Sequence, residues 1–406
     1  MDFNSSPSSV MHIDINSCFA TIEQQANPFL RGKSVAVAAY ATKNGCILAA
    51  SYPAKAFGVK TGMRVKDGLA LCPNMIILPP DPPKYRFIHK KMHALLNKYS
   101  LSVHPKSIDE FVVDFKSKNS QSSNRNLLNV GLEIKERIKK EIGSAITVSI
   151  GISTNGFLAK TAASYKKPDG LFEINKGNFY QVYESLKLTN LCGIKNANAA
   201  RLSSAGIYDV LGFYNADLQK LKIAFRSINS YYWLMRLHGF EIDDYLFERK
   251  SFGSQYALTY PYETFEELRP ILTKLTEKTA RRLRNKNYFA GGIHLSILFR
   301  DHTYWHHGMK LAYPVFSSND FTKLVYKLFF MCPVKKPVRL LSVTVFNLQK
   351  NKNLQLDLTT DVIKKQNLTK ALDKINNLFG DYTITPARII NNEGYVLDRI
   401  AFGVIS

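Results

Sequence analysis

Ser107-Ile108-Asp109-Glu110, followed by the apolar run 111–115, is the stretch around which the chain is organised. Neighbouring side chains of a strand point to opposite faces, so two adjacent carboxylates serve one site only where that alternation is broken. We therefore expect Asp109 and Glu110 at a turn or at the start of a strand. Asp and Glu disfavour strands, and a hard divalent cation with oxygen ligands would neutralise the pair. A solvated turn is the plainer interpretation of the pair taken alone.

The composition favours a multidomain protein with a polyanionic partner. A chain of 406 residues is too long for one ordinary core, so about two to four domains are expected. The 55 Lys and Arg against 32 Asp and Glu give a net charge of +23, which favours nucleic acid first and an anionic membrane surface second. No apolar run approaches the ~18 residues of a spanning helix, so no membrane segment is expected. The five cysteines are scattered and lack a C-x-x-C pair, which favours reduced thiols in a cytoplasmic protein.

Strands and helices alternate in the first 170 residues, which predicts an α/β or α+β domain. Residues 10–16 alternate as a half-buried strand, with His12, Asp14 and Asn16 on its polar face. From residue 171 to about residue 239 short helices replace the strands. The first nine residues lack both a basic start and an apolar core, so we expect a short flexible tail and no signal peptide.

The region after residue 250 has the order strand, helix, strand, strand, helix, strand. Residues 251–345 contain 14 basic and 6 acidic side chains, which predicts contact with a phosphate backbone, with a merely solvated basic face as the alternative. The basic side chains concentrate on a helix expected at residues 266–287. The candidate DNA-binding residues are Lys274, Lys278, Arg281, Arg282 and Arg284.

Three carboxylates could converge if two strands are neighbours. Asp14 lies near the end of one strand, and Asp109-Glu110 begins another. Three carboxylates suffice to hold two magnesium ions for an in-line phosphoryl or nucleotidyl transfer. Groups that could neutralise a triphosphate stand at loop positions, although each lysine alone is more often a surface charge. They are Tyr52, Lys55, Lys160, Lys166 and Lys167.

Two further features have a functional and a structural interpretation. Phe19 follows Asp14 by five residues, and a bulky ring beneath the site would reject a sugar with a 2′-hydroxyl by collision. Core packing is the preferred interpretation of Phe19 from spacing alone. Leu191-Cys192-Gly193-Ile194 could be a helix-hairpin-helix that binds phosphate through backbone amides, although glycine also simply ends helices.

The order and spacing of these motifs resemble the Y-family translesion DNA polymerases of the bacterial DinB and UmuC kind. The matching stretches are residues 12–20, 45–58, 107–110 and 157–170. The resemblance implies an α+β multidomain right-hand fold. Its expected parts are a palm of residues 1–25 and 81–170, fingers of 26–80, a helical thumb of 171–239 with the hairpin-like segment, a linker of 240–250, an α/β little finger of 251–348 and a tail of 349–406.

The resemblance also implies roles for single residues. Asp14, Asp109 and Glu110 would be catalytic metal ligands together with the Ile15 carbonyl, Phe19 would be the steric gate, and Tyr52, Lys55 and Lys167 would hold the triphosphate. The implied function is low-fidelity, template-directed translesion synthesis by two-Mg²⁺-ion nucleotidyl transfer from a dNTP to the primer 3′-hydroxyl of primer–template DNA. Lys55 stands where many DinB-type members have Arg, and Asn16 replaces a frequent Asp.

The C-terminal part resembles the family's clamp-binding tail. Gln355, Leu356, Asp357 and Leu358 resemble a sliding-clamp peptide without its final aromatic residue, with a polar strand as the alternative, and residues 368–380 resemble a short tail helix. We expect a monomer. The rival interpretations are a catalytically silent relative that acts as a DNA- and clamp-binding scaffold, and a two-metal nuclease. A silent relative would lack the carboxylates, and a nuclease gives Phe19 and the triphosphate-binding residues no role.

Overall fold

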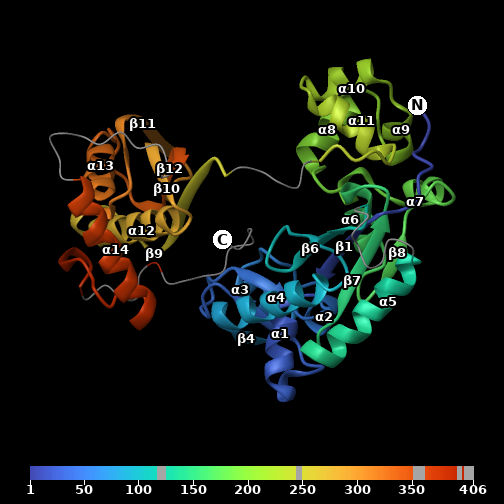
Figure 1. Cartoon of the computed structure of the whole chain (residues 1–406), viewed down its shortest axis with the longest axis horizontal. Helices are drawn as coiled ribbons and strands as arrows, with labels where there is room; N and C mark the ends of the chain where they lie inside the picture. The colour runs from blue at the N-terminus through green and yellow to red at the C-terminus, as the bar shows by residue number, and fades with distance from the viewer. Residues whose placement is uncertain (117–124, 244–248, 351–361, 391–395, 397–406) are drawn as a thin grey trace. The chain divides into compact units, whose positions relative to one another are not determined.

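The structure is a computed structural model that describes residues 1–116, 125–243, 249–350, 362–390 and 396 (Figure 1). It divides into two compact units, an N-terminal unit of Met1–Tyr245 and a C-terminal unit of Leu246–Asp398. The finer domain bounds expected from the sequence stay predictions. None of the described helices combines the length and the hydropathy needed to cross a membrane.

A five-stranded sheet forms the centre of the N-terminal unit, with β1 as its middle strand. Strand β1 is antiparallel to both of its neighbours, β6 and β7. The order is β5 (Ser102–Pro105), β6 (Glu110–Asp114), β1 (Val10–Ile15), β7 (Val148–Ser153) and β8 (Leu171–Glu173). Strand β8 corrects the expectation that strands end before residue 171. A strand of three residues is too short for alternation to reveal it.

Helices cover both faces of this sheet. Helix α4 (Pro82–Leu96) and helix α5 (Leu127–Arg137) contribute to the core beneath Met11, Ile13 and Ile15. Helix α6 (Gly156–Tyr165) packs on the other face, against β1 and β7. A Cβ atom on Gly151 would lie only 2.0 Å from the Ala159 carbonyl oxygen, so glycine allows α6 to approach β7 this closely. Helix α6 therefore lies directly over the polar face of β1.

A smaller three-stranded sheet brings further side chains to the end of β1. Its strands are β3 (Ile47–Ala50), β2 (Val35–Ala38) and β4 (Ile76–Leu78), and α3 (Val65–Leu71) adds to its core. Helix α1 (Cys18–Ala26) follows β1 almost at once, and helix α2 (Tyr52–Ala56) follows β3. These two helix starts carry Phe19, Tyr52 and Lys55.

The rest of the N-terminal unit is helical and includes the first residues of the chain. Its helices are α7 (Phe179–Ser185), α8 (Asn196–Ser204), α9 (Val210–Asn215), α10 (Leu218–Phe225) and α11 (Asn229–Leu237). The Phe3 ring is buried and stacks on Phe179 at 4.2 Å, and Asn4 Nδ2 donates to the Gly239 carbonyl at 2.9 Å. The expected flexible tail is therefore wrong at these residues, because a single aromatic side chain leaves no periodic signal.

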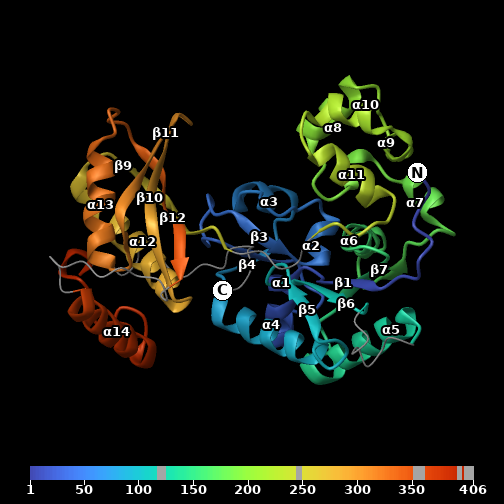
Figure 2. The ribbon, with the colours of Figure 1, turned by 45° about the horizontal axis from the view of Figure 1, so that its top comes forward.

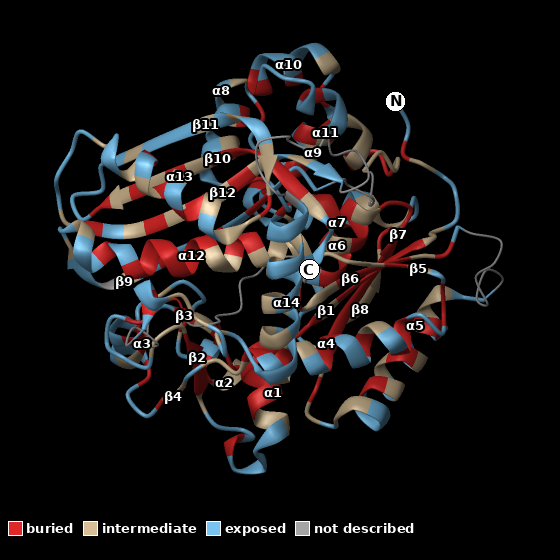
Figure 3. Cartoon of the chain, turned by 60° about the vertical axis from the view of Figure 1, so that its left-hand side comes forward, coloured by how far each residue is buried: buried red, intermediate tan, exposed pale blue. Residues whose placement is uncertain are grey.

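The C-terminal unit has the predicted order of strands and helices. The elements are β9 (Ser251–Tyr262), α12 (Phe265–Asn285), β10 (Tyr288–Phe299), β11 (Tyr304–Val315), α13 (Ser318–Phe330) and β12 (Val338–Lys350). The antiparallel sheet has the order β11-β10-β12-β9, and both helices lie against one of its faces (Figure 2). Figure 3 shows the buried stripe of α12 facing this core and the exposed residues of the edge strand β11.

Candidate active site

The structure brings Asp14 and Glu110 together at the end of β1, and it places Asp109 beside them with its carboxylate outside the group of ligand atoms that His12, Asp14 and Glu110 form. Asp14 pairs directly with Glu110 across β1 and β6. Asp109 precedes β6, and its carbonyl oxygen accepts a hydrogen bond from the Ile15 amide at 2.9 Å. The Ser107 hydroxyl donates to Asp109 Oδ1 at 2.5 Å and accepts from the Glu110 amide at 3.1 Å. The two adjacent carboxylates thus stand at a turn and a strand start, as predicted.

His12 joins this cluster, although the sequence did not single it out as a site residue. Within the described residues, His12, Asp14 and Glu110 form a group that could hold a metal ion, since their ligand atoms lie within 4.8 Å of one another. The His12 side chain is 2% exposed, and neither ring nitrogen has a hydrogen-bond partner. Burial lowers its pKa to about 3, so the imidazole is neutral and available as a ligand. The feature of the sequence that could have identified His12 is its place on the same strand face as Asp14.

Two lysines neutralise two of the carboxylates. Lys167 Nζ lies 2.6 Å from Asp14 Oδ2, and Lys160 Nζ lies 2.6 Å from Glu110 Oε2. Burial raises the pKa of Asp14 against the opposing effect of Lys167, and burial also raises the pKa of Asp109. Burial alone would raise the pKa of Glu110, but its neighbours, with Lys160 among them, hold that pKa below its ordinary value.

The residues expected to bind a triphosphate lie beside the carboxylates. Lys55 Nζ donates to the Ser17 hydroxyl at 2.7 Å and lies 4.6 Å from the centre of the Tyr52 ring. Burial lowers the pKa of Lys55, and the like charge of Lys167 lowers it further. Burial and the charge of Asp14 raise the pKa of Tyr52. The mutual influence of these groups shows that they share one neighbourhood.

Asn16 holds the loop that carries Lys167. Its side chain donates to the Ser149 hydroxyl at 2.8 Å and accepts from the Asp169 amide at 2.9 Å. The Asp169 carboxylate also lies 3.0 Å from Lys135 Nζ. The substitution of a frequent Asp by Asn16 thus gives an amide that can donate and accept at once. The Asn16 side chain thus connects the loop that carries Lys167 to the end of β1 through a hydrogen bond.

Phe19 is packed as a core residue. Its ring is 0% exposed and stacks on Tyr85, with ring centres 4.5 Å apart and planes 17° apart. The Tyr85 hydroxyl in turn donates to Glu23 at 2.8 Å. The packing interpretation accounts for the position fully, and the gate role stays a prediction.

The basic residues of α12 contact other parts of the C-terminal unit. Arg284 forms a two-point ion pair with Asp373 at 2.6 and 2.7 Å, and Arg281 binds Asp381 and Asn377. These partners lie on helix α14 (Val362–Phe379) and just after it. Lys274 is buried, and its Nζ lies 5.2 Å from the centre of the Tyr382 ring. Arg282 donates to the Gly253 carbonyl at 3.1 Å. Lys278 is half-buried. Their role in DNA binding stays a prediction.

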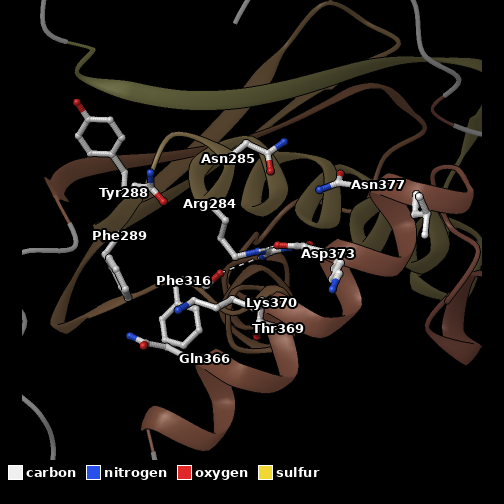
Figure 4. A pocket seen from close by; sticks show the side chains of 13 residues that line it. Arg284, Asn285, Tyr288, Phe289, Phe316, Gln366, Thr369, Lys370, Asp373 and Asn377 are labelled. Carbon is white, nitrogen blue, oxygen red and sulfur yellow. Dashed lines mark hydrogen bonds and ion pairs between the residues drawn. The ribbon is translucent and has the colours of Figure 1, made fainter.

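A pocket of about 490 Å³ lies between α14, α12 and β10 (Figure 4). Its lining includes the rings of Tyr288, Phe289 and Phe316. The carboxylate in this lining, Asp373, is paired with Arg284. The lysines of the lining, Lys370 and Lys374, therefore have no free carboxylate beside them in the lining with which to form an acid–base pair.

The residues of the clamp-like peptide, 355–358, lie outside the described residues, so clamp binding stays a prediction. Helix α14 covers the tail helix expected at residues 368–380 and begins six residues earlier, at Val362.

Comparisons with known proteins identify the family. The model of the impB/mucB/samB family matches residues 13–164, and that of the family's C-terminal domain matches residues 249–358. DNA polymerase IV 1 of Bacillus subtilis (strain 168) is 32% identical, covering 95% of this chain and 94% of the relative. DNA polymerase IV of Pelotomaculum thermopropionicum is 30% identical over 95% of this chain and 98% of the relative. The chain belongs to the Y family of DNA polymerases.

Solved structures agree with this assignment of the Y-family polymerase. A Y-family DNA polymerase chimera of Dbh and Dpo4 has a TM-score of 0.74 at 24% identity, covering 84% of this chain and 99% of the chimera. An insertion ternary complex of Dbh DNA polymerase has a TM-score of 0.59 at 25% identity over 84% of this chain and 99% of that one. The predicted family and the right-hand polymerase fold are confirmed. The Y-family polymerase is a DNA-directed DNA polymerase of the translesion class, and the silent-scaffold alternative is not favoured.

Proposed function

We propose that this Y-family polymerase joins a dNTP to the 3′-end of a primer on template DNA, with Asp14, Asp109 and Glu110 as metal ligands and the Ile15 carbonyl as a further ligand. The primer 3′-oxygen attacks the α-phosphate, and pyrophosphate leaves. The observation that carries the proposal is the direct pairing of Asp14 with Glu110 beside Asp109. Two magnesium ions, when bound there, would stabilise the attacking and leaving oxygens.

Tyr52, Lys55 and Lys167 hold the triphosphate in this proposal. The two ammonium groups oppose its negative charge, and the Tyr52 hydroxyl can donate a hydrogen bond to a phosphate oxygen. Lys55 supplies a point charge and lacks the planar fork of an arginine, so it leaves the phosphate orientation to its neighbours. The shared neighbourhood of these residues and Asp14 supports the assignment.

Primer extension by carboxylate variants tests the metal assignment. We expect Asp14→Asn, Asp109→Asn and Glu110→Gln each to lower the extension rate by at least about 10²-fold, because each removes a negative charge that would hold a metal cation, and the cation would stabilise the negative charge that develops on the phosphate. Asp114→Asn is the matched control, since Asp114 ends the same strand β6 and binds the Lys116 amide at 2.8 Å. Full activity in the Asp109 or Glu110 variant would refute the assignment.

We propose Phe19 as the steric gate, and the packing of its ring decides which variant can test it. Phe19→Ala would leave a cavity in the core at a cost of roughly 3–5 kcal/mol, so Phe19→Leu is the better choice. We expect the ratio of dNTP to rNTP incorporation to fall by about tenfold or more in Phe19→Leu. Tyr85→Phe, which keeps the stacked ring, should preserve the ratio. Unchanged sugar discrimination in Phe19→Leu would leave core packing as the whole role of this residue.

We place DNA contacts of the C-terminal unit on the sheet face opposite its helices. Three of the candidate residues on α12, Arg281, Arg282 and Arg284, already bind acidic or carbonyl groups of their own unit. Lys310 on β11 is exposed and pairs with Gly292, on the face opposite Met309 and Ile293. Its exposed ammonium has no ion pair with another of the described residues, so it can reach a phosphate without first breaking one.

A further inference from the structure

One oxygen atom of Asp14 has two possible partners. Lys167 Nζ lies 2.6 Å from Asp14 Oδ2, and the two side chains are 33% and 13% exposed. A magnesium ion binds carboxylate oxygens at about 2.0–2.1 Å. A divalent ion on this oxygen would lie within a few ångströms of the Lys167 ammonium, where the two like charges repel. The ammonium and the ion therefore compete for Asp14.

Lys167 can leave Asp14 without leaving the site. Its loop is held by the Asn16–Asp169 hydrogen bond, so a change of partner involves the side chain alone. Lys55 Nζ lies 4.6 Å from the centre of the Tyr52 ring, and burial together with the charge of Lys167 lowers the pKa of Lys55, so both residues are neighbours of Lys167. A triphosphate bound by Lys55 and Tyr52 would bring several negative charges to the same ammonium and attract it away from the single charge of Asp14.

Lys160 has a different position. It lies on α6, and its ammonium is 2.6 Å from Glu110 Oε2, next to the buried imidazole of His12. The two lysines therefore contact different carboxylates, Lys160 that of Glu110 and Lys167 that of Asp14.

We propose that Lys167 is an exchangeable counter-ion that holds Asp14 until a nucleoside triphosphate arrives, so that binding of the triphosphate frees Asp14 for the metal. This inference rests on the proposed function and adds how its metal site is regulated. Metal and nucleotide affinities are then coupled through one side chain, and the coupling acts in both directions.

Mn²⁺ binding to the full-length protein without nucleotide tests the competition. Titration followed by electron paramagnetic resonance should show about tenfold tighter Mn²⁺ binding in Lys167→Met than in wild type, because one partly buried ion pair no longer competes. Lys55→Met removes the same charge from the same neighbourhood, yet Lys55 binds a hydroxyl and, as far as the chain is described, no carboxylate. It should tighten Mn²⁺ binding no more than about threefold.

The double variant Asp14→Asn/Lys167→Met locates the effect. Its Mn²⁺ affinity should equal that of Asp14→Asn, because removal of Lys167 increases the affinity only when the Asp14 carboxylate is present. The proposal would be overturned if Mn²⁺ affinity rose equally in Lys55→Met and Lys167→Met, or if it did not rise in Lys167→Met. Either result would leave the assignment of the metal site intact. A double variant that binds Mn²⁺ as tightly as Lys167→Met does would instead remove Asp14 from the metal site and refute the proposed function with it.

Nucleotide binding without metal gives the reciprocal measurement. With EDTA present, dATP should bind about fivefold more tightly to Asp14→Asn than to Asp109→Asn, because only the first variant releases Lys167. Both variants remove one negative charge near the triphosphate site, so each loses a similar electrostatic repulsion between that site and dATP. Equal dATP affinities in the two variants would contradict the proposal that Lys167 exchanges Asp14 for the triphosphate.

Discussion

The N-terminal and C-terminal units both contain clusters of paired charges, and the pairs are built differently. In the N-terminal unit, Lys160 and Lys167 each hold one carboxylate oxygen through one ammonium contact. In the C-terminal unit, the Arg284 guanidinium donates to both oxygens of Asp373 and also to the Phe316 carbonyl and the Ser318 hydroxyl. A single lysine contact can exchange its partner cheaply, whereas a planar fork with several bonds has no equivalent alternative. The first cluster thus suits a binding site, and the second secures a helix.

Removal of Arg284 should give the largest effect in the C-terminal unit. Arg284 and Asp373 are 13% and 17% exposed, so Arg284→Met leaves a mostly buried carboxylate without its partner. We expect the free energy of unfolding to fall by about 2–4 kcal/mol, less than for a fully buried pair. Urea denaturation with Trp305 as the reporter, in a Trp233→Phe background, would measure it. Arg339→Met, which removes an exposed arginine near His302, should change stability by less than about 0.5 kcal/mol.

The pH dependence of this loss gives a second readout. Burial already raises the pKa of Glu277, and the charges of Arg284 and Asp373 act on it in opposite directions. Without Arg284, Glu277 loses a positive charge that lowers its pKa, so burial and the charge of Asp373 raise that pKa further in the folded state. The variant therefore gains stability as pH falls and loses it as pH rises through the raised pKa of Glu277, so its deficit should be smaller at pH 5 than at pH 8. A deficit independent of pH would mean that lost packing, and not an unpaired charge, causes it.

The salt dependence of DNA binding gives the smallest expected effect and separates the two assignments of the DNA surface. Arg281→Met should leave the slope of log K against log salt unchanged, because Asp381 and Asn377 already hold Arg281. Lys310→Met should lower the magnitude of the slope by about 0.9, the value for one phosphate contact. A fall of this size in Arg281→Met would show that α14 gives up its contacts when DNA binds, and would restore the expectation drawn from the sequence.

The catalytic carboxylates were predictable because their sequence conflicts with local structure. Strand propensity does not explain adjacent Asp109 and Glu110 at the start of an apolar strand, because Asp and Glu are disfavoured in strands. The alternation of apolar and polar residues placed Asp14 on the polar face of its strand. The alternating pattern of residues 10–16 also predicted β1, and the order of strands and helices in the C-terminal unit was predicted as well. His12 shared the polar face of Asp14, but a histidine inside a buried strand has a structural role more often than a catalytic one, so its place in the cluster was missed.

The partners of the charged side chains could not be predicted. Lys167 is 153 residues from Asp14, and Arg284 is 89 residues from Asp373. Neither separation leaves a periodic trace in the sequence. A run of basic residues on a helix therefore predicted a DNA surface, because the acidic partners on α14 are invisible until the chain is folded. Net charge states how much a protein attracts polyanions and says little about which side chains remain available to do so.

The docking of α14 makes the C-terminal part of the chain a structural element of its unit. Helix α14 begins at Val362 and is fastened through Asp373 to Arg284 of α12. A chain shortened before Val362 would keep the four strands of the sheet and helices α12 and α13, but it would leave the mostly buried Arg284 guanidinium without its carboxylate. A truncation at this point therefore changes the stability of the unit as well as removing residues that another protein could bind.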